Sequence, residues 1–190
     1  GGMALTALIL GGEEVLRAYL RMLRTSGSGG TDYYRDEGGI AVMFNMGING
    51  FFASIFVIGA GGELNGPTIG GILSIVGFSA TGKHLRNTFP IMAGVCFSMI
   101  TGSWNLNDPS VLLALLFSTT LAPIAGEFGV ICGILAGFLH TSVALNVGVV
   151  YGGMNLYNNG FAGGMVAIFL VPVIQSIRDR AARARGEHSL

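Results

Sequence analysis

Residues 40–60 read IAVMFNMGINGFFASIFVIGA, a stretch without a single charged side chain. A helix of about 20 apolar residues spans the roughly 30 Å hydrocarbon core of a bilayer. The apolar character continues beyond this stretch, because residues 39–177 carry few charges in a chain of 190 residues. Soluble domains have about a quarter charged residues, whereas this chain has 11% and a mean hydropathy of +0.66. The sequence therefore predicts an all-α, polytopic membrane protein.

Six apolar stretches follow one another, and we expect them to cross the membrane as a helical bundle. They are residues 40–60, 64–80, 89–104, 110–125, 128–150 and 161–177. Several are shorter than about 20 residues, so we expect some short or broken spans. Around this transmembrane domain (40–177) we expect the end of a truncated span (1–10), a cytoplasmic loop with a short amphipathic helix (11–39) and a basic cytoplasmic tail (178–190).

The positive charges predict the orientation. All ten Lys and Arg residues lie within residues 17–35, 83–86 and 178–185, and counting six spans places these segments on one side. Basic loops face the cytoplasm. We therefore expect a multi-pass protein of the cell inner (plasma) membrane with a cytoplasmic C-terminus. Its net charge is zero, so we expect the lipid bilayer and not nucleic acid as a partner.

The N-terminal segments are interpreted from length and charge. Residues 1–10 are apolar but too short to span, so we expect a missing N-terminal half of the parent chain. Glu13 precedes Arg17 by four residues, a spacing that supports a helix. That helix could lie on anionic lipid or form part of an ordinary loop between spans, and we favour the loop.

Glycine is abundant, with 32 residues, and one group has helical spacing. Gly129, Gly133 and Gly137 recur every four residues, which lets two membrane helices approach closely. The two cysteines, Cys96 and Cys132, lie in predicted spans, where we expect free thiols that act as small apolar side chains.

Two segments resemble each other at an offset of 93 residues. Residues 64–75 align with residues 157–168, so that Asn65 matches Asn158 and both copies continue with a Gly-Gly pair. We expect an internal repeat of the kind from which transporters are built, with a substrate site between the copies. The pattern also suggests irregular helix starts, which membranes tolerate where backbone lines a watery cavity.

Polar residues inside predicted spans are candidates for a solute site. His140 lies near the middle of its span, where an ionisable group suggests function, although a neutral imidazole bonded between helices fits equally. Asn45 and Asn49 share a helix face, where they could line a path or link helices, and we favour the link. Glu127 could lie at the membrane boundary or in a path, and we favour the boundary. The candidate solute-binding residues are Asn65, Gly66, Thr68, His140, Asn146, Asn158 and Asn159.

Sequence motifs of enzymes are missing from this chain. It has no phosphate-binding lysine loop, no nucleophile elbow and no zinc-protease helix. Its cysteines and histidines lack metal-ligand spacing. We therefore expect neither an enzyme nor a cofactor or metal.

Three motifs carry a resemblance to a known family: ELNGPTIGGIL (63–73), TLAPIAG (120–126) and NLYNNGFAGG (155–164). From about residue 31 to residue 177 the chain resembles a family of bacterial multipass membrane proteins of unknown function. This resemblance implies an integral membrane protein of roughly twice this length, without an assigned activity.

A looser resemblance is to urea transporters, carried by residues 65–70 and 156–160. It implies homo-oligomers, namely trimers with a pore in each protomer, lined by half-helices and paired phenylalanines. The two segments lie further apart here, and no phenylalanine pair can be assigned. Urea is therefore not assigned as the solute.

These observations favour a channel or transporter for a small polar solute. The alternative is a membrane scaffold or assembly protein without a solute pathway, in which glycines pack helices and Asn and His side chains link them. A membrane-embedded enzyme is the weakest of the three hypotheses.

Overall fold

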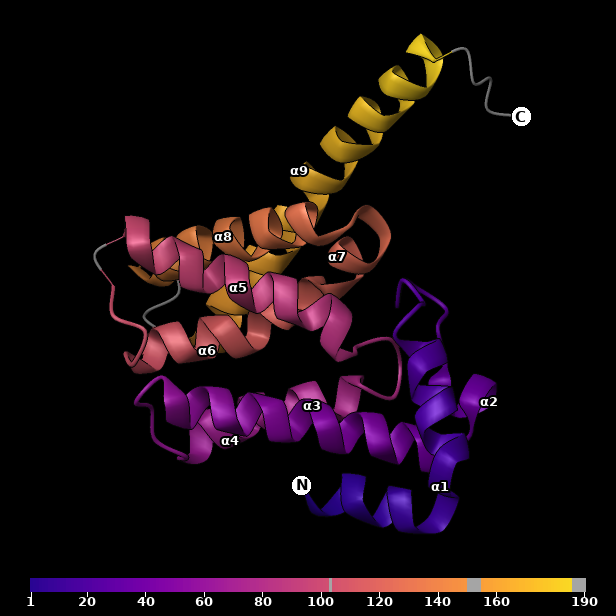
Figure 1. Cartoon of the computed structure of the whole chain (residues 1–190). Helices are drawn as coiled ribbons and strands as arrows, with labels where there is room; N and C mark the ends of the chain where they lie inside the picture. Colours follow the sequence, from indigo (N-terminus) through magenta and orange to yellow (C-terminus); the bar gives the residue numbers. More distant parts are fainter. Residues whose placement is uncertain (103, 150–154, 186–190) are drawn as a thin grey trace.

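The computed structural model describes residues 1–102, 104–149 and 155–185, and these residues form helices joined by turns, without strands (Figure 1). The prediction of an all-α fold is confirmed. The elements are α1 (Gly2–Met22), α2 (Tyr33–Glu37), α3 (Gly39–Gly59), α4 (Gly66–Phe78), α5 (Leu85–Thr101), α6 (Pro109–Ser118), the 3-10 turn η1 (Thr119–Leu121), α7 (Ala122–Phe128), α8 (Val130–Asn146), the 3-10 turn η2 (Val147–Val149) and α9 (Asn155–Ala184).

Among the described residues, three helical stretches are long and apolar enough to cross a membrane: Gly39–Gly59, Pro109–Phe128 and Tyr157–Ala184. Two apolar helices, Gly66–Phe78 and Val130–Asn146, are shorter. The apolar helices indicate a membrane protein with short spans, as the sequence predicts. The number of crossings and their direction in a bilayer stay predictions.

One of the long stretches is broken. Within Pro109–Phe128, α6 ends at Ser118, η1 forms a single tighter turn, and α7 begins with Pro123 in its first turn. Proline lacks an N–H group and is suited to a helix start. The sequence therefore resets the helix in mid-span, which agrees with the expectation of broken spans.

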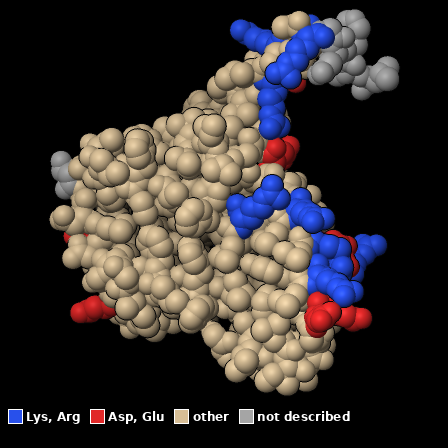
Figure 2. Space-filling view, viewed as in Figure 1, with Lys and Arg blue, Asp and Glu red and all other residues tan. Residues whose placement is uncertain are grey.

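The apolar helices lie alongside one another (Figure 1). Successive helices from α3 to α6 run in alternating directions, α1 crosses one end of the bundle, and the C-terminal part of α9 projects beyond it. In the face drawn in Figure 2, Lys and Arg gather beside α1 and on the projecting end of α9. The opposite edge of that face shows acidic but no basic side chains. This distribution agrees with the clustering of basic segments in the sequence.

The N-terminal region differs from a simple division into span and loop. A single helix, α1, runs from the predicted span end into the predicted loop, but Gly12 has φ +54° and ψ −136°, which kinks the helix there. The part before the kink packs on α3, because Gly47 leaves room for the backbone of Ala4. The predicted ion pair forms after the kink, with Arg17 and Glu13 3.1 Å apart. The predicted span end at 150 and residues 151–154 of the loop after it lie outside the described residues.

Close helix packing occurs between α5 and α8, where Gly94 lies against the backbone of Ile134, Gly137 against that of Ile91, and Gly133 against the side chain of Pro90. A Cβ atom at Gly94 would collide with the carbonyl oxygen of Ile134, and one at Gly137 with that of Ile91. The predicted glycine face is therefore present at two of its three positions. Gly129 differs, because it forms the turn between α7 and α8 with φ +95° and faces open space.

We predict that Gly137→Ala lowers the stability of the fold, because the added methyl group meets backbone that cannot turn away. Overpacking of this kind costs about 1–3 kcal/mol. Gly164→Ala is the matched control, since a Cβ at Gly164 meets nothing within 4 Å and alanine favours a helix. Thermal unfolding in detergent, followed by circular dichroism, measures both variants. Equal midpoints for both would contradict the α5–α8 contact.

Candidate functional site

The turn between α4 and α5, residues 79–84, is fastened from inside the bundle by Asn45. Its side-chain amide donates to the carbonyl oxygens of Ser79 at 2.7 Å and Lys83 at 2.8 Å. The amide of Asn49 in turn donates to the side-chain oxygen of Asn45 at 2.9 Å. Both asparagines are buried. Asn45 therefore links α3 to the turn, as the sequence analysis favours, and Asn49 supports it from the same helix. Neither asparagine lines the cavities described below.

The same turn is held from its other side by polar groups around Gly82. The carbonyl oxygen of Gly82 accepts from Asn87 Nδ2 at 2.8 Å and from the hydroxyl of Tyr33 at 3.3 Å. Gly82 has φ +136° and lies directly against Gly27, so neither position accepts a larger residue. These contacts fix the backbone from which the side chain of Lys83 extends.

Lys83 points into the protein. Its Nζ donates to Oγ1 of Thr119 at 2.9 Å, lies 4.9 Å from the centre of the Phe78 ring, and only 8% of the residue is exposed. The ion pairs found among the described residues join Arg17 to Glu13 and Arg21 to Glu37, so this ammonium has no carboxylate there. Burial lowers the pKa of Lys83 to about 8, so most of it is still charged at pH 7.

Lys83 lines a cavity of about 220 Å³, which we call the lysine cavity. The end of α4, the break after α6 and an early turn of α9 form its walls. The wall residues combine one cation, two hydroxyls, one amide and two aromatic rings. They are Ser74, Phe78, Lys83, Phe117, Thr120, Asn159 and Gly160.

One of the predicted site residues lines this cavity, and two others adjoin that residue in the fold or in the chain. Asn159 lines it, and the carbonyl oxygen of Asn159 lies 3.2 Å from Nε2 of His140. His140, Asn158 and Asn159 are all buried. Nδ1 of His140 and Oδ1 of Asn158 have no hydrogen-bond partner among the described residues. The structure thus joins the predicted histidine to the second Asn segment.

Asn65 and Thr68 have a local structural role at the opposite end of α4. Asn65 Oδ1 accepts from the N–H of Thr68 at 3.1 Å, and Thr68 Oγ1 accepts from the N–H of Asn65 at 2.9 Å. This reciprocal capping satisfies donors that a helix start leaves free. Gly66 begins the helix, and a Cβ there would meet nothing within 4 Å.

A second cavity, of about 310 Å³, lies at this end of α4 and is called the cap cavity. Asn65 and Thr68 line it together with Pro109 and Leu112 of α6. Along α4 the nearest wall residues of the two cavities, Thr68 and Ser74, are six residues apart, a helical rise of about 9 Å. The predicted site residues are therefore divided between two places.

Asn146 lies apart from both cavities. It is exposed, and its amide donates to the carbonyl oxygen of Ser142 in the same helix at 2.7 Å. The two aligned Asn segments also differ in position, because Asn65 precedes α4 whereas Asn158 lies inside α9. The internal repeat stays a prediction.

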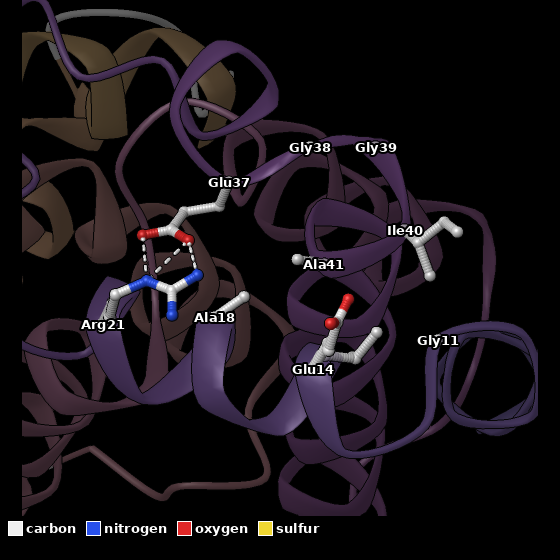
Figure 3. Close-up of a pocket in the computed structure, with 10 residues that line it drawn as sticks. Gly11, Glu14, Ala18, Arg21, Glu37, Gly38, Gly39, Ile40 and Ala41 are labelled. Atoms are coloured by element: carbon white, nitrogen blue, oxygen red, sulfur yellow. Dashed lines mark hydrogen bonds and ion pairs between the residues drawn. The ribbon is translucent and has the colours of Figure 1, made fainter.

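A third cavity, of about 300 Å³, lies where α1 meets α2 and α3 (Figure 3). Its charged side chains include Arg21 and Glu37, which face each other and bond at 2.6 and 2.9 Å. Glu14 lies near Ala41 on the other side. Because its arginine is already paired, we interpret this cavity as part of the junction that holds α1.

Sequence reasoning missed Lys83, Ser74, Phe117 and Thr120. The sequence places Lys83 in a basic loop, although the nearest acids in sequence are Glu63 and Asp108, 20 and 25 residues away. The sequence does contain one signal for an unusual lysine, namely a single lysine without nearby acids at the end of an apolar helix. Its inward direction depends on the packing of Asn45 and Thr119, which sequence spacing does not show.

Apolar helices, a broken span and a buried polar centre define a helical membrane protein. The chain belongs to the family described as protein of unknown function (DUF1576), whose model matches residues 12–176. No curated protein and no solved structure matches the chain. The resemblance to urea transporters therefore has no support from these comparisons.

We predict that Asn65→Ala lowers the free energy of unfolding by about 1 kcal/mol, the usual cost of losing a helix N-cap. Asn65→Ser keeps an oxygen that can accept from the Thr68 N–H and should retain most of the stability. Denaturation in detergent measures both variants. If the serine variant is as unstable as the alanine variant, Asn65 acts through something other than capping.

We predict that acid destabilises the fold through His84. This residue is buried, its Nε2 lies 3.2 Å from the carbonyl oxygen of Thr25, and burial lowers its pKa from 6.5 to about 4. Between pH 6.5 and 4 the unfolded chain binds the proton and the folded chain does not, so stability falls as pH falls. At pH 4.5 the loss is about 2–3 kcal/mol.

The comparison of wild type with His84→Gln isolates this effect from other acid-titrating groups. Tyr33 and Arg86 lie near the ring, and both keep their protonation state over this range. The decrease in unfolding free energy between pH 7 and pH 4.5 should be smaller in the variant. Parallel pH profiles would show that His84 does not titrate in this way.

Proposed function

We propose that this protein is a channel or transporter for a small polar solute. The observation that carries the proposal is the lysine cavity, in which the buried Lys83 lies beside a helix break among apolar helices. Backbone that departs from a helix at membrane depth is tolerated where it is buried in protein or lines a watery cavity. The break from Ser118 to Leu121 lies beside the lysine cavity, because Thr120 is one of the wall residues.

The solute path runs between α4 and α6. Both helices contribute to the cap cavity and to the lysine cavity, one at each end. Between the cavities the path is closed by apolar packing, with Gly71 against Leu116 and with Ile75 and Leu112 in the same hydrophobic cluster. Passage therefore requires α6 to move relative to α4, and the break after Ser118 supplies a hinge.

The proposal also includes an orientation in the membrane, the absence of catalysis, self-association and a place for each predicted site residue. The basic end of the molecule faces the cytoplasm of the inner membrane, the chain carries out no catalysis, and copies of it associate. Asn65 and Thr68 lie at the outer entrance, and Asn159 with His140 at the inner site. The Lys and Arg distribution supports the orientation.

A membrane scaffold is the second candidate, and specific contacts favour it. Asn45, Asn49 and Thr68 use their side chains to link or cap helices within the chain. The closed packing between Gly71 and Leu116 also fits a protein without a pathway. A flux measurement separates the two functions.

We predict that the full chain in liposomes accelerates equilibration of at least one small polar solute. Stopped-flow light scattering with urea, glycerol, formate and ammonium salts measures it. Asn159→Leu should abolish the acceleration, because it replaces an amide in the cavity wall with an apolar side chain. Asn105→Leu makes the same change at an exposed residue outside both cavities and should leave the rate unchanged.

Flat traces for all solutes, from protein shown to be folded and inserted, would support the scaffold. Equal loss in both asparagine variants would indicate a general effect of the substitution and remove the lysine cavity from the path.

A further inference from the structure

We infer that the solute is a small monovalent anion, bound in the lysine cavity by the ammonium group of Lys83. The inference rests on the proposed transport function and names its substrate class. The cavity walls add the hydroxyls of Ser74 and Thr120 and the amide of Asn159.

The first argument is charge. A buried cation is costly unless an opposite charge or hydrogen bonds compensate it. Only 8% of Lys83 is exposed. The ion pairs among the described residues join Glu13 to Arg17 and Glu37 to Arg21, so neither carboxylate neutralises Lys83. An anion in the adjoining cavity would supply the missing charge.

The second argument is donor geometry. An ammonium group has three N–H donors and no acceptor, and among the described residues Thr119 Oγ1 takes one of them. That hydroxyl donates its own proton to the carbonyl oxygen of Leu116 at 2.7 Å. Thr119 therefore presents an acceptor to Lys83 and fixes it, which leaves two N–H groups to bind a ligand.

The third argument is direction. A lysine near a membrane boundary normally extends its charge outward to water. Arg86, three residues later, is exposed and donates to the carbonyl oxygen of Leu23 at 3.1 Å. Lys83 instead turns inward to Thr119, held by the bond from Asn45 to its carbonyl oxygen. The fold thus separates a surface cation from an interior one.

Size and charge limit the ligand. The lysine cavity of about 220 Å³ exceeds the roughly 10–15 Å³ that one water needs and is smaller than the roughly 300 Å³ of drug-sized pockets. It contains one cationic side chain, so it neutralises one negative charge. Formate and nitrate match both limits, whereas a nucleotide or a polyanion does not.

Binding and flux are tested with nitrate against urea, two planar molecules of similar size that differ in charge. Calorimetry on the full chain in a neutral detergent should show saturable binding of sodium nitrate and none of urea. Lys83→Met should abolish nitrate binding and still fold, because it removes an uncompensated charge and keeps the side-chain length. Lys83→Arg should retain binding, weakened by its larger head group.

The pH dependence gives a second readout. Lys83 is the titratable residue among the cavity walls formed by α4, η1, α6 and α9, and its neighbour His84 is neutral above pH 6. Nitrate affinity should therefore fall about tenfold per pH unit above pH 8. An affinity that is constant to pH 10, or that is unchanged in Lys83→Met, would overturn the anion site.

The outcomes distinguish this inference from transport itself. Nitrate flux that is lost in Lys83→Met supports both. Urea flux without nitrate binding keeps transport and overturns the anion. Nitrate binding without flux of any solute keeps the anion site and removes transport. Retention of phosphatidylglycerol by wild type but not by Lys83→Met in native mass spectrometry, without nitrate binding, would assign the cation to a lipid headgroup and overturn the soluble anion.

Discussion

The fold depends on satisfying the backbone of one turn inside an apolar bundle. Residues 79–84 leave the helix ladder, and unpaired peptide groups in such surroundings cost free energy comparable to a lost hydrogen bond. The side-chain amide of Asn45 donates to the carbonyl oxygens of Ser79 and Lys83. Asn87 and Tyr33 donate to a third carbonyl oxygen of the turn, that of Gly82. This arrangement connects α3, α4 and α5 and directs Lys83 toward Thr119.

Composition and hydropathy predict much of the fold, because they follow from the requirement for apolar residues in a membrane. The helices expected from residues 40–60 and 64–80 begin and end within about two residues of α3 and α4. The glycine spacing identifies Gly133 and Gly137 as contact points for α5. The break inside residues 109–128 follows from Pro123, but its place beside a cavity does not.

The candidate site is less predictable because it is assembled from residues far apart in sequence. The sequence indicates His140 as a polar residue inside a predicted span and Asn159 as part of the second Asn segment, and the structure places the His140 ring 3.2 Å from the carbonyl oxygen of Asn159. Asn65 has the same sequence signature, yet it caps a helix. A pattern of Asn and Gly describes both a helix start and a wall residue, and only packing separates the two. Lys83 is not predicted as a site residue, because a charged side chain in a loop is expected to lie at the surface.

The order of synthesis gives the Lys83–Thr119 bond a further consequence. Tyr33 and Asn45 precede the turn in the chain, so the turn can close as soon as it is made. Thr119 follows by 36 residues, and domains mature from the N-terminal end during translation. Lys83 therefore gains this acceptor only after α5 and α6 have been made. The bond depends on the break after α6 and cannot form before that break is in place.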